Sequence, residues 1–206
     1  IAIDINQIIE KNKALISIFA GSRKSEIETL TPILIDFIKL MNMKYKDFIY
    51  VFHSTKENVK LIQFYINKEG LDNCEIISDE KIKSHILKKS VFAVAKSGTV
   101  SLEICNSKIP SIIIYKMGLI NYLIIKMLVK TKYANIINIA AKKEIIPELL
   151  QTKCNPENIF RHVSSFLEDP KKIKNQIIEI QSILDTLKID ESSSLKAAKS
   201  LNIILE

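Results

Sequence analysis

Five short apolar runs recur along the chain, and longer stretches of mixed polar and apolar residues separate them. The runs occupy residues 15–20, 48–52, 74–77, 91–95 and 111–115. Continuous apolar runs of this length are typical of strands that are buried on both faces of a parallel sheet. The pattern therefore predicts five buried parallel strands.

Helical patterns lie between these runs. Ile27, Leu30, Leu34 and Phe37 recur at steps of three or four, and similar patterns occupy residues 59–65 and 100–104. Alternation of strands and helices predicts right-handed crossovers and an open parallel sheet, that is, a Rossmann-like α/β fold. Such a sheet binds its ligands beyond the carboxyl ends of its strands.

From residue 155 onward the pattern is only helical. One apolar stripe runs along this part of the chain, formed by Ile173, Ile177, Ile180, Leu184 and Leu187. A stripe of this kind predicts a helix packed on its own domain, and the alternative is a partner interface, such as a homodimer through the C-terminal helices. We expect a Rossmann-like domain over residues 1–154 and C-terminal helices over residues 155–206.

Composition agrees with one substantial α/β domain, because 47% of the 206 residues are apolar. The three cysteines are far apart in the sequence and lack the spacing of a metal site or disulfide framework, which favours a reducing cytoplasm. The net charge of +7 comes from scattered lysines without an aromatic platform, so we expect no nucleic-acid partner.

The sequence offers no sign of export or of a membrane span. No signal-peptide pattern is visible, and Ile1 stands in mid-pattern, so we expect a part of a longer protein. The longest apolar region, residues 109–129, is interrupted by Pro110, Lys116 and Lys126. It is therefore not a predicted transmembrane helix.

The first candidate site is the turn after residues 15–20. Gly21 allows the backbone to turn sharply there, and Ser25 and Glu28 have the spacing of a capping box that begins the next helix. Arg23 adds a guanidinium group suited to phosphate oxygens at a helix N-terminus. The turn predicts a diphosphate site, and the alternative is a surface arginine beside a capped helix.

A second candidate turn follows residues 91–95. Ser97, Gly98 and Thr99 supply two hydroxyls and a flexible turn at another helix N-terminus. Glu103 lies four residues beyond Thr99, where its carboxylate can accept both hydroxyls of a ribose. The alternative role for Glu103 is to compensate the helix dipole.

Five segments in order resemble the lipid-A-disaccharide synthase family, glycosyltransferases built from two Rossmann-like domains (the GT-B fold). The segments are AGSRKSEI, SGTVSLE, IPSIIIYK, LVKTKYANIINI and IPELLQ, and they run from about residue 15 to Gln151. The resemblance implies half of a GT-B fold, with the N-terminal acceptor domain absent from this sequence.

The activity implied by the resemblance is transfer of 2,3-diacylglucosamine from its UDP derivative to 2,3-diacylglucosamine 1-phosphate, with inversion and release of UDP. It also implies a Gram-negative bacterium and a cytoplasmic protein peripheral to the inner membrane. The implied UDP-sugar-binding residues are Gly21, Ser22, Arg23, Glu26, Ser97, Gly98, Thr99, Glu103, Asn138, Glu148 and Gln151. The last three are placed near the sugar or the diphosphate.

The sequence departs from the pattern of the family at three places, which together comprise five residues. Phe19-Ala20 replaces its Leu-Pro, Lys96 precedes the SGT turn, and Lys142-Lys143 replaces its Gly-Arg. Lys143 keeps the positive charge of the family's arginine but lacks its bidentate geometry, and Lys142 lacks the flexibility of glycine.

An inverting transfer needs a base, and this sequence offers no catalytic residue in its motifs. His53, His85 and His162 lie outside them and are interpreted as surface or strand-end histidines. In the family the base is a carboxylate of the N-terminal domain. We expect UDP binding without sugar transfer, and no metal or cofactor, because no D-x-D cluster is present to hold Mg²⁺.

Apolar and basic residues adjoin each other over residues 119–132, including Ile124, Ile125, Lys126 and Lys130. Such a stretch can rest on an anionic membrane surface, and the alternative is a core helix with solvated lysines. Two other functions stay open: a different GT-B enzyme, such as a UDP-sugar epimerase or peptidoglycan glycosyltransferase, and a noncatalytic nucleotide-binding module.

Overall fold

The sheet contains six parallel strands in the computed structural model, which describes residues 13–118 and 132–187. Its order is β3-β2-β1-β4-β5-β6, and every neighbouring pair is parallel. The strands are β1 (Ala14–Phe19), β2 (Phe48–His53), β3 (Cys74–Ile77), β4 (Ser90–Lys96), β5 (Ser111–Tyr115) and β6 (Glu148–Leu150). The predicted Rossmann-like open parallel sheet is confirmed.

The five predicted strands are all present, with bounds shifted by at most one residue at either end. The sixth strand, β6, was not predicted from the pattern. It has only three residues and pairs with β5 at the edge of the sheet. A run this short carries too little periodicity to be distinguished from a loop.

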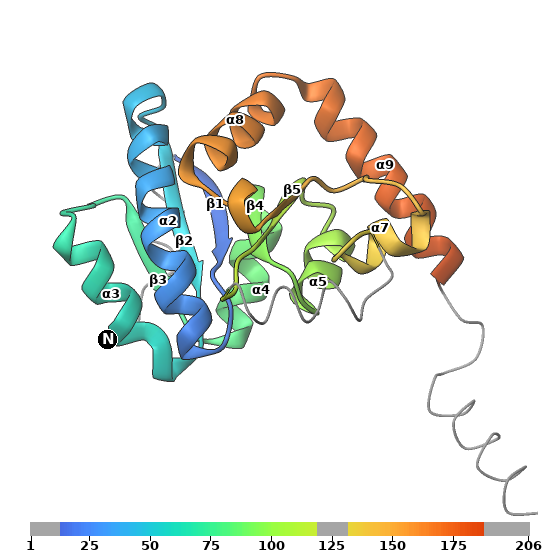
Figure 1. The fold of residues 1–206 in the computed structure, drawn as a ribbon. Helices are drawn as coiled ribbons and strands as arrows, with labels where there is room; N and C mark the ends of the chain where they lie inside the picture. The colour runs from blue at the N-terminus through green and yellow to red at the C-terminus, as the bar shows by residue number, and fades with distance from the viewer. Residues whose placement is uncertain (1–12, 119–131, 188–206) are drawn as a thin grey trace, which may run out of the picture.

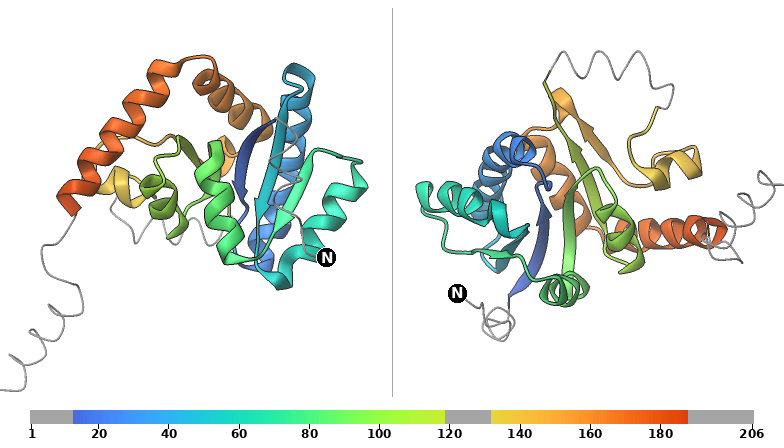
Figure 2. Two further views of the ribbon diagram at one scale, coloured as in Figure 1. Left: turned by 180° about the vertical axis from the view of Figure 1, so that it is seen from behind. Right: turned by 90° about the horizontal axis from the view of Figure 1, so that it is seen from below.

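Helices cover both faces of the sheet (Figures 1 and 2). One face packs against α2 (Lys24–Lys44), α3 (Val59–Lys68) and α8 (Pro156–Leu167). The other packs against α4 (Glu80–Lys89), α5 (Val100–Asn106), α7 (Ile136–Ala141) and the C-terminal part of α9 (Pro170–Leu187). Two short 3₁₀ turns, η1 (Lys56–Asn58) and η2 (Gln151–Lys153), complete the described elements.

Strand β1 shows why each strand appears in the sequence as a continuous apolar run. Ile16 and Ile18 face the core beneath α2, whereas Leu15 and Phe19 face the opposite layer of helices. Since side chains alternate between the two faces of a strand, a sheet covered on both faces needs apolar residues at nearly every position.

The two C-terminal helices pack on the sheet domain. Asn155 caps α8 by accepting a hydrogen bond from the Asn158 N–H, and Pro156 takes the first helical position. In α9, the buried Gln176 amide bonds both the N–H and the carbonyl of Ser111 at the start of β5. Residues 188–206 of the predicted C-terminal region lie outside the described residues.

The predicted stripe of α9 is partly buried. Ile180 and Leu184 enter the core beside α5 and α7, and Ile173 packs at the edge of the opposite core. Leu187, at the end of the helix, is 42% exposed. In the described ranges, no helix has both the length and the apolar character needed to cross a membrane. Residues 119–131, most of the basic and apolar stretch, lie outside those ranges.

Candidate functional site

A cavity of about 620 Å³ opens where the strand order of the sheet reverses. Strands β1 and β4 are neighbours there, and the chain leaves them toward α2 and α5 on opposite faces of the sheet. Their carboxyl ends are in register, since Phe19 pairs with Ala95. A crevice at this switch point is the ligand site expected for an open parallel sheet.

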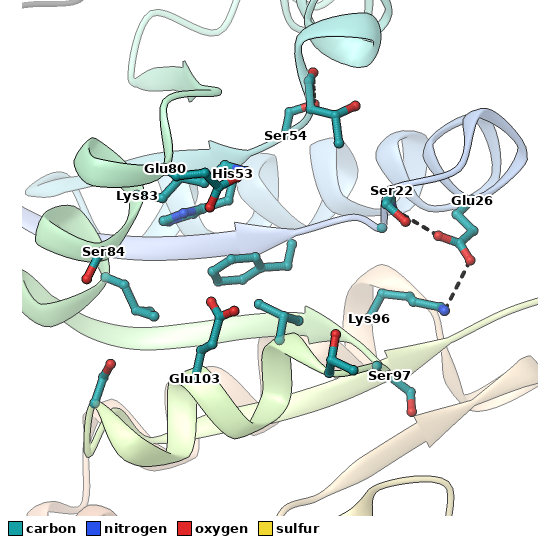
Figure 3. A pocket seen from close by; sticks show the side chains of 18 of the residues that line it. Ser22, Glu26, His53, Ser54, Glu80, Lys83, Ser84, Lys96, Ser97 and Glu103 are labelled. Atoms are coloured by element: carbon teal, nitrogen blue, oxygen red, sulfur yellow. Dashed lines mark hydrogen bonds and ion pairs between the residues drawn. The ribbon is translucent and has the colours of Figure 1, made fainter. Parts of the chain in front are cut away.

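The loop after β1 forms one end of the cavity (Figure 3). Gly21 has a φ of +113°, which L-residues rarely adopt, and a β-carbon there would lie 2.4 Å from Glu26 Oε2. The same oxygen accepts hydrogen bonds from the N–H groups of Ser22 at 3.0 Å and Arg23 at 3.2 Å. Glycine is therefore required by both the backbone conformation and the close approach of Glu26.

Glu26 also joins the two predicted turns. Its Oε1 lies 3.1 Å from Lys96 Nζ, at the end of β4. Burial raises the pKa of Glu26, but hydrogen bonds from Lys96, Arg23 and Ser22 outweigh this effect, so the pKa lies below its ordinary value. The carboxylate is consequently charged at neutral pH.

The predicted Ser25–Glu28 capping box is wrong. Helix α2 begins at Lys24 with Arg23 at the N-cap, and the residue that reaches back to the loop is Glu26. Ser25 lies inside the first turn, where its carbonyl accepts a hydrogen bond from Thr29 Oγ1. The N-cap is therefore Arg23, two residues before the predicted Ser25, and Glu26 rather than Glu28 takes the third helical position.

Arg23 is exposed and does not line the cavity. Its backbone N–H binds Glu26, while its position at the N-cap places it beside the loop that bounds the cavity. The structure thus brings Gly21, Ser22 and Glu26 into the cavity wall and leaves Arg23 beside it.

The loop after β4 supplies Ser97, Gly98 and Thr99, all of which line the cavity. The Ser97 hydroxyl donates to the carbonyl of Ala134 at 3.0 Å, so it anchors the loop to the segment before α7. Gly98 differs from Gly21, because a β-carbon at Gly98 meets nothing within 4 Å.

Glu103 projects into the middle of the cavity from α5 (Figure 3). It faces the group formed by His53, Glu80 and Lys83, and the pair formed by Glu26 and Lys96 lies farther along the cavity. Across the described part of the chain, neither an ion pair nor a hydrogen bond occupies its exposed carboxylate. The carboxylate is therefore available to a ligand's hydroxyl groups.

Sequence reasoning missed the far end of the cavity. The residues there end β2, follow it directly or lie on α4, and they are His53, Ser54, Thr55, Glu80, Lys83, Ser84 and Leu87. The carboxyl end of β2 lies on the same edge of the sheet as those of β1 and β4. The rule that ligands bind beyond the carboxyl ends of parallel strands is enough to identify His53 and its neighbours. It does not identify the residues of α4, because this helix was not predicted from the sequence.

His53 forms part of a buried hydrogen-bond chain under the cavity. The Ser90 hydroxyl donates to the Ile86 carbonyl, so it accepts from Ser17, and Ser17 in turn accepts from His53 Nε2 at 2.8 Å. This direction fixes the neutral tautomer with its proton on Nε2. Burial, followed by the charge of Lys83, lowers the pKa of His53 to about 3.

The buried His53 predicts a pH-dependent stability. An unfolded histidine gains a proton near pH 6.5 and the folded one only near pH 3, so stability is complete above pH 6.5 and falls as the pH drops. Between pH 7 and pH 5, we expect His53 to account for a loss of about 2 kcal/mol. Urea unfolding at both pH values measures this loss.

His53→Gln keeps a donor for Ser17 but does not titrate, so its stability should change less between pH 7 and pH 5 than that of the wild type. His85→Gln is the matched control, because His85 is exposed on α4. An equal pH effect in the wild type and in His53→Gln would contradict the prediction.

The structure places Asn138, Glu148 and Gln151 outside the cavity wall. Asn138 is fully buried, and its amide bonds the N–H groups of Ile145 and Ile146, the Ile146 carbonyl and Glu148 Oε1. Gln151 adopts a φ of +53° after β6, and its Oε1 accepts from the Met117 N–H. The three residues therefore hold backbone segments together.

Glu148 connects this cluster to the cavity. Its carboxylate accepts hydrogen bonds from Ala134 N–H at 2.7 Å, Asn135 N–H at 2.9 Å and Asn138 Nδ2 at 2.8 Å. The carbonyl of Ala134 accepts in turn from the Ser97 hydroxyl. Glu148 thus fixes the segment on which the second loop rests.

The Lys142-Lys143 departure has a structural consequence at the end of α7. Lys142 adopts the left-handed conformation, with a φ of 54°, which glycine adopts at lower cost. Lys143 Nζ lies 2.5 Å from Glu179 Oε2 on α9. Its charge is directed to α9 rather than to the cavity wall.

Fold and cavity together define the class of this chain: a Rossmann-like α/β domain of the kind that forms half of a GT-B fold, with a cavity at the switch point of the sheet. Residues 3–202 match the family model described as lipid-A-disaccharide synthetase. The chain belongs to the lipid-A-disaccharide synthase family.

Individual relatives support this assignment. The chain is 34% identical over 190 residues to a lipid-A-disaccharide synthase of Rickettsia prowazekii, covering 90% of this chain and 48% of the relative. It is 37% identical over 183 residues to the enzyme of Persephonella marina, covering 85% and 48%. The chain spans about half the length of these curated relatives.

Solved structures share the fold at lower sequence identity. The C-terminal domain of a group 1 glycosyltransferase from Francisella tularensis has a TM-score of 0.57 and 17% identity, with 90% of this chain and 93% of that domain covered. A UDP-GlcNAc 2-epimerase from Neisseria meningitidis has a TM-score of 0.58 and 16% identity, with 89% and 47% covered. At these identities the similarity establishes the fold alone.

Proposed function

We propose that this chain is the donor-binding half of a lipid-A-disaccharide synthase. The whole enzyme would transfer 2,3-diacylglucosamine from its UDP derivative to 2,3-diacylglucosamine 1-phosphate, with inversion at the anomeric carbon, and would release UDP. Family membership supports the reaction. The cavity at the switch point supports the assignment of donor binding to this chain.

One observation carries the proposal: among the described residues, Glu103 presents an unpaired carboxylate to the same cavity whose other end is formed by Glu26 and Lys96. A nucleoside diphosphate has its ribose between its phosphates and its base. With the phosphates near Gly21, Ser22, Gly98 and Thr99, the ribose reaches Glu103, whose carboxylate accepts its hydroxyls. The base then occupies the end lined by His53 and Thr55.

The remaining proposed donor residues act around this ligand. Arg23 lies at the entrance beside the phosphates, and Glu26 holds the loop that carries them. We assign Asn138 and Glu148 a positioning role near the sugar and diphosphate, through the segment that binds Ser97. Gln151 would support the chain beyond β5 in the same way.

Sugar transfer would require a base from outside this sequence. The histidine in the cavity, His53, is buried and neutral, with its Nε2 proton committed to Ser17. We therefore expect the 206-residue chain to bind UDP without transferring sugar, and no metal is part of the proposal.

Association with the cytoplasmic face of the inner membrane remains a sequence prediction, based on residues 119–132 and on the acylated substrates. Flotation with anionic liposomes tests it, and absence of enrichment would count against it. Dimerisation through the C-terminal helices is likewise a prediction that concerns residues 155–206.

Binding of UDP to the chain, measured by calorimetry, tests the proposed function. Glu103→Ala should weaken binding by about tenfold or more, because two hydroxyl groups lose a charged acceptor. Arg23→Ala should weaken it less, since this side chain is exposed and lies outside the cavity wall.

Glu157→Ala is the matched control, because Glu157 is an exposed carboxylate in the first turn of α8. It should bind UDP like the wild type. Equal UDP affinity of the wild type and Glu103→Ala would refute the ribose assignment. Absence of UDP binding by both this chain and the full-length protein would refute the proposed function.

A further inference from the structure

Lys96 lies between the two loops that bound the cavity. It is the last residue of β4, and its ammonium group reaches across to the loop after β1, where it lies 3.1 Å from Glu26 Oε1 (Figure 3). The ring of Tyr115 lies below the ammonium, 5.2 Å from Nζ to the ring centroid. With a side chain only 20% exposed, Lys96 is held in place from two sides.

The Glu26 carboxylate shows that this end of the cavity accommodates anionic oxygen atoms. One of its oxygens accepts the N–H groups of Ser22 and Arg23, and the other faces Lys96. Backbone N–H groups and a lysine ammonium are the donors that bind phosphate oxygens. A carboxylate of the chain itself therefore uses the donors that a diphosphate would need.

The charges of the cavity wall make Lys96 decisive. Among the described residues, the wall carries three carboxylates, Glu26, Glu80 and Glu103, and two lysines, Lys83 and Lys96. Lys83 is paired with Glu80 at 2.7 Å, at the far end. Without Lys96, the end proposed for the phosphates would present an unpaired Glu26 and repel a polyanion.

We propose that Lys96 is a diphosphate-binding residue, held ready by Glu26, and that its ammonium group shifts from the carboxylate to the phosphate oxygens when the ligand enters. This inference deepens the proposed function, on which it rests for the identity of the ligand. Since Arg23 lies outside the cavity wall and Lys83 is paired with Glu80, Lys96 supplies the cation at the end proposed for the phosphates. The step is an exchange of ion-pair partners, with no bond made or broken.

Titrations with inorganic pyrophosphate, UDP and uridine, followed by NMR chemical shifts of the chain, test this inference. Lys96→Gln should weaken both phosphate-containing probes by about tenfold, the loss expected for one charge-assisted hydrogen bond, and should leave uridine unaffected. Lys83→Gln is the matched control, a paired lysine at the other end of the cavity, and should leave pyrophosphate binding unchanged.

Glu26→Gln adds a readout that a purely structural role would not produce. The amide oxygen can still accept from Ser22 and Arg23, but it no longer neutralises Lys96, so pyrophosphate should bind more tightly than to the wild type. The double variant Lys96→Gln/Glu26→Gln should bind better than Lys96→Gln alone, because the repelling carboxylate is absent.

The outcomes separate this inference from the proposed function. If pyrophosphate binding depends on Lys96 but UDP does not bind, the lysine assignment is supported. The proposal that the ligand is UDP is then contradicted. UDP binding that is identical in the wild type and Lys96→Gln contradicts the lysine assignment alone. If neither pyrophosphate nor UDP binds to this chain or to the full-length protein, both the lysine assignment and the proposed function are contradicted.

Discussion

Replacing Gly21 with alanine is expected to destabilise the chain by about 3 kcal/mol and to weaken UDP binding by about 100-fold. Two costs combine at this position. The φ of +113° is strained for any residue with a β-carbon, and the added atom would lie 2.4 Å from Glu26 Oε2. Relief of the clash moves Glu26 away from Ser22 and Lys96, which deforms the proposed phosphate end of the cavity.

Gly98→Ala is the matched control for this prediction, since both glycines line the cavity and only Gly21 has a positive φ and a close neighbour. Urea unfolding and UDP calorimetry should show Gly98→Ala close to the wild type. In a Glu26→Ala background, Gly21→Ala should cost less stability, because the contact with Oε2 is gone and only the backbone strain and the 2.8 Å contact with the β-carbon of residue 26 remain. Equal effects of alanine at Gly21 and Gly98 would show that neither argument holds.

The contrast between these glycines shows what the sequence could predict about the site. Both residues stand between a buried strand and a helix, so the sequence assigned both to phosphate turns. In the structure both line the cavity, and their binding of phosphate stays a prediction. The need for glycine differs, however, because it depends on the positive φ of Gly21 and on the Glu26 carboxylate folding back over the turn, whereas the sequence assigned the capping role to Glu28.

Lys96 illustrates a second limit. In the sequence it was a departure from the family beside the SGT turn, without an assigned partner. Its partner Glu26 is 70 residues away, and they meet because β1 and β4 are neighbours in the sheet. Alternating strands and helices predict a parallel sheet, but they do not determine which strands lie side by side. The ion pair therefore had to come from the structure.

The buried cluster around Asn138 illustrates a third limit. Resemblance to the family placed Asn138, Glu148 and Gln151 near the ligand, whereas their side chains bind backbone groups beneath the second loop. A motif records which residues a family shares, but it does not distinguish a residue that contacts a ligand from one that positions the contact.

Glu148→Ala is expected to destabilise the chain by about 3 kcal/mol and to weaken UDP binding. Glu148 is only 8% exposed, and its removal leaves the N–H groups of Ala134 and Asn135 and the Asn138 amide without this acceptor. Each buried donor that loses its partner costs about 1–3 kcal/mol, and relaxation or entry of water offsets part of the total. Urea unfolding at neutral pH measures the stability.

The expected loss of binding follows from the link between Glu148 and the second loop. Ala134 accepts from Ser97 through its carbonyl, so a displaced segment withdraws the anchor of that loop. Ser97→Ala removes the same anchor without disturbing the buried carboxylate, so it should weaken UDP binding with little loss of stability. Glu144→Ala controls for charge, because Glu144 is exposed and, among the described residues, its carboxylate accepts a hydrogen bond only from the Glu148 N–H. If Glu148→Ala lost stability but bound UDP with full affinity, Glu148 would support the fold without positioning the site.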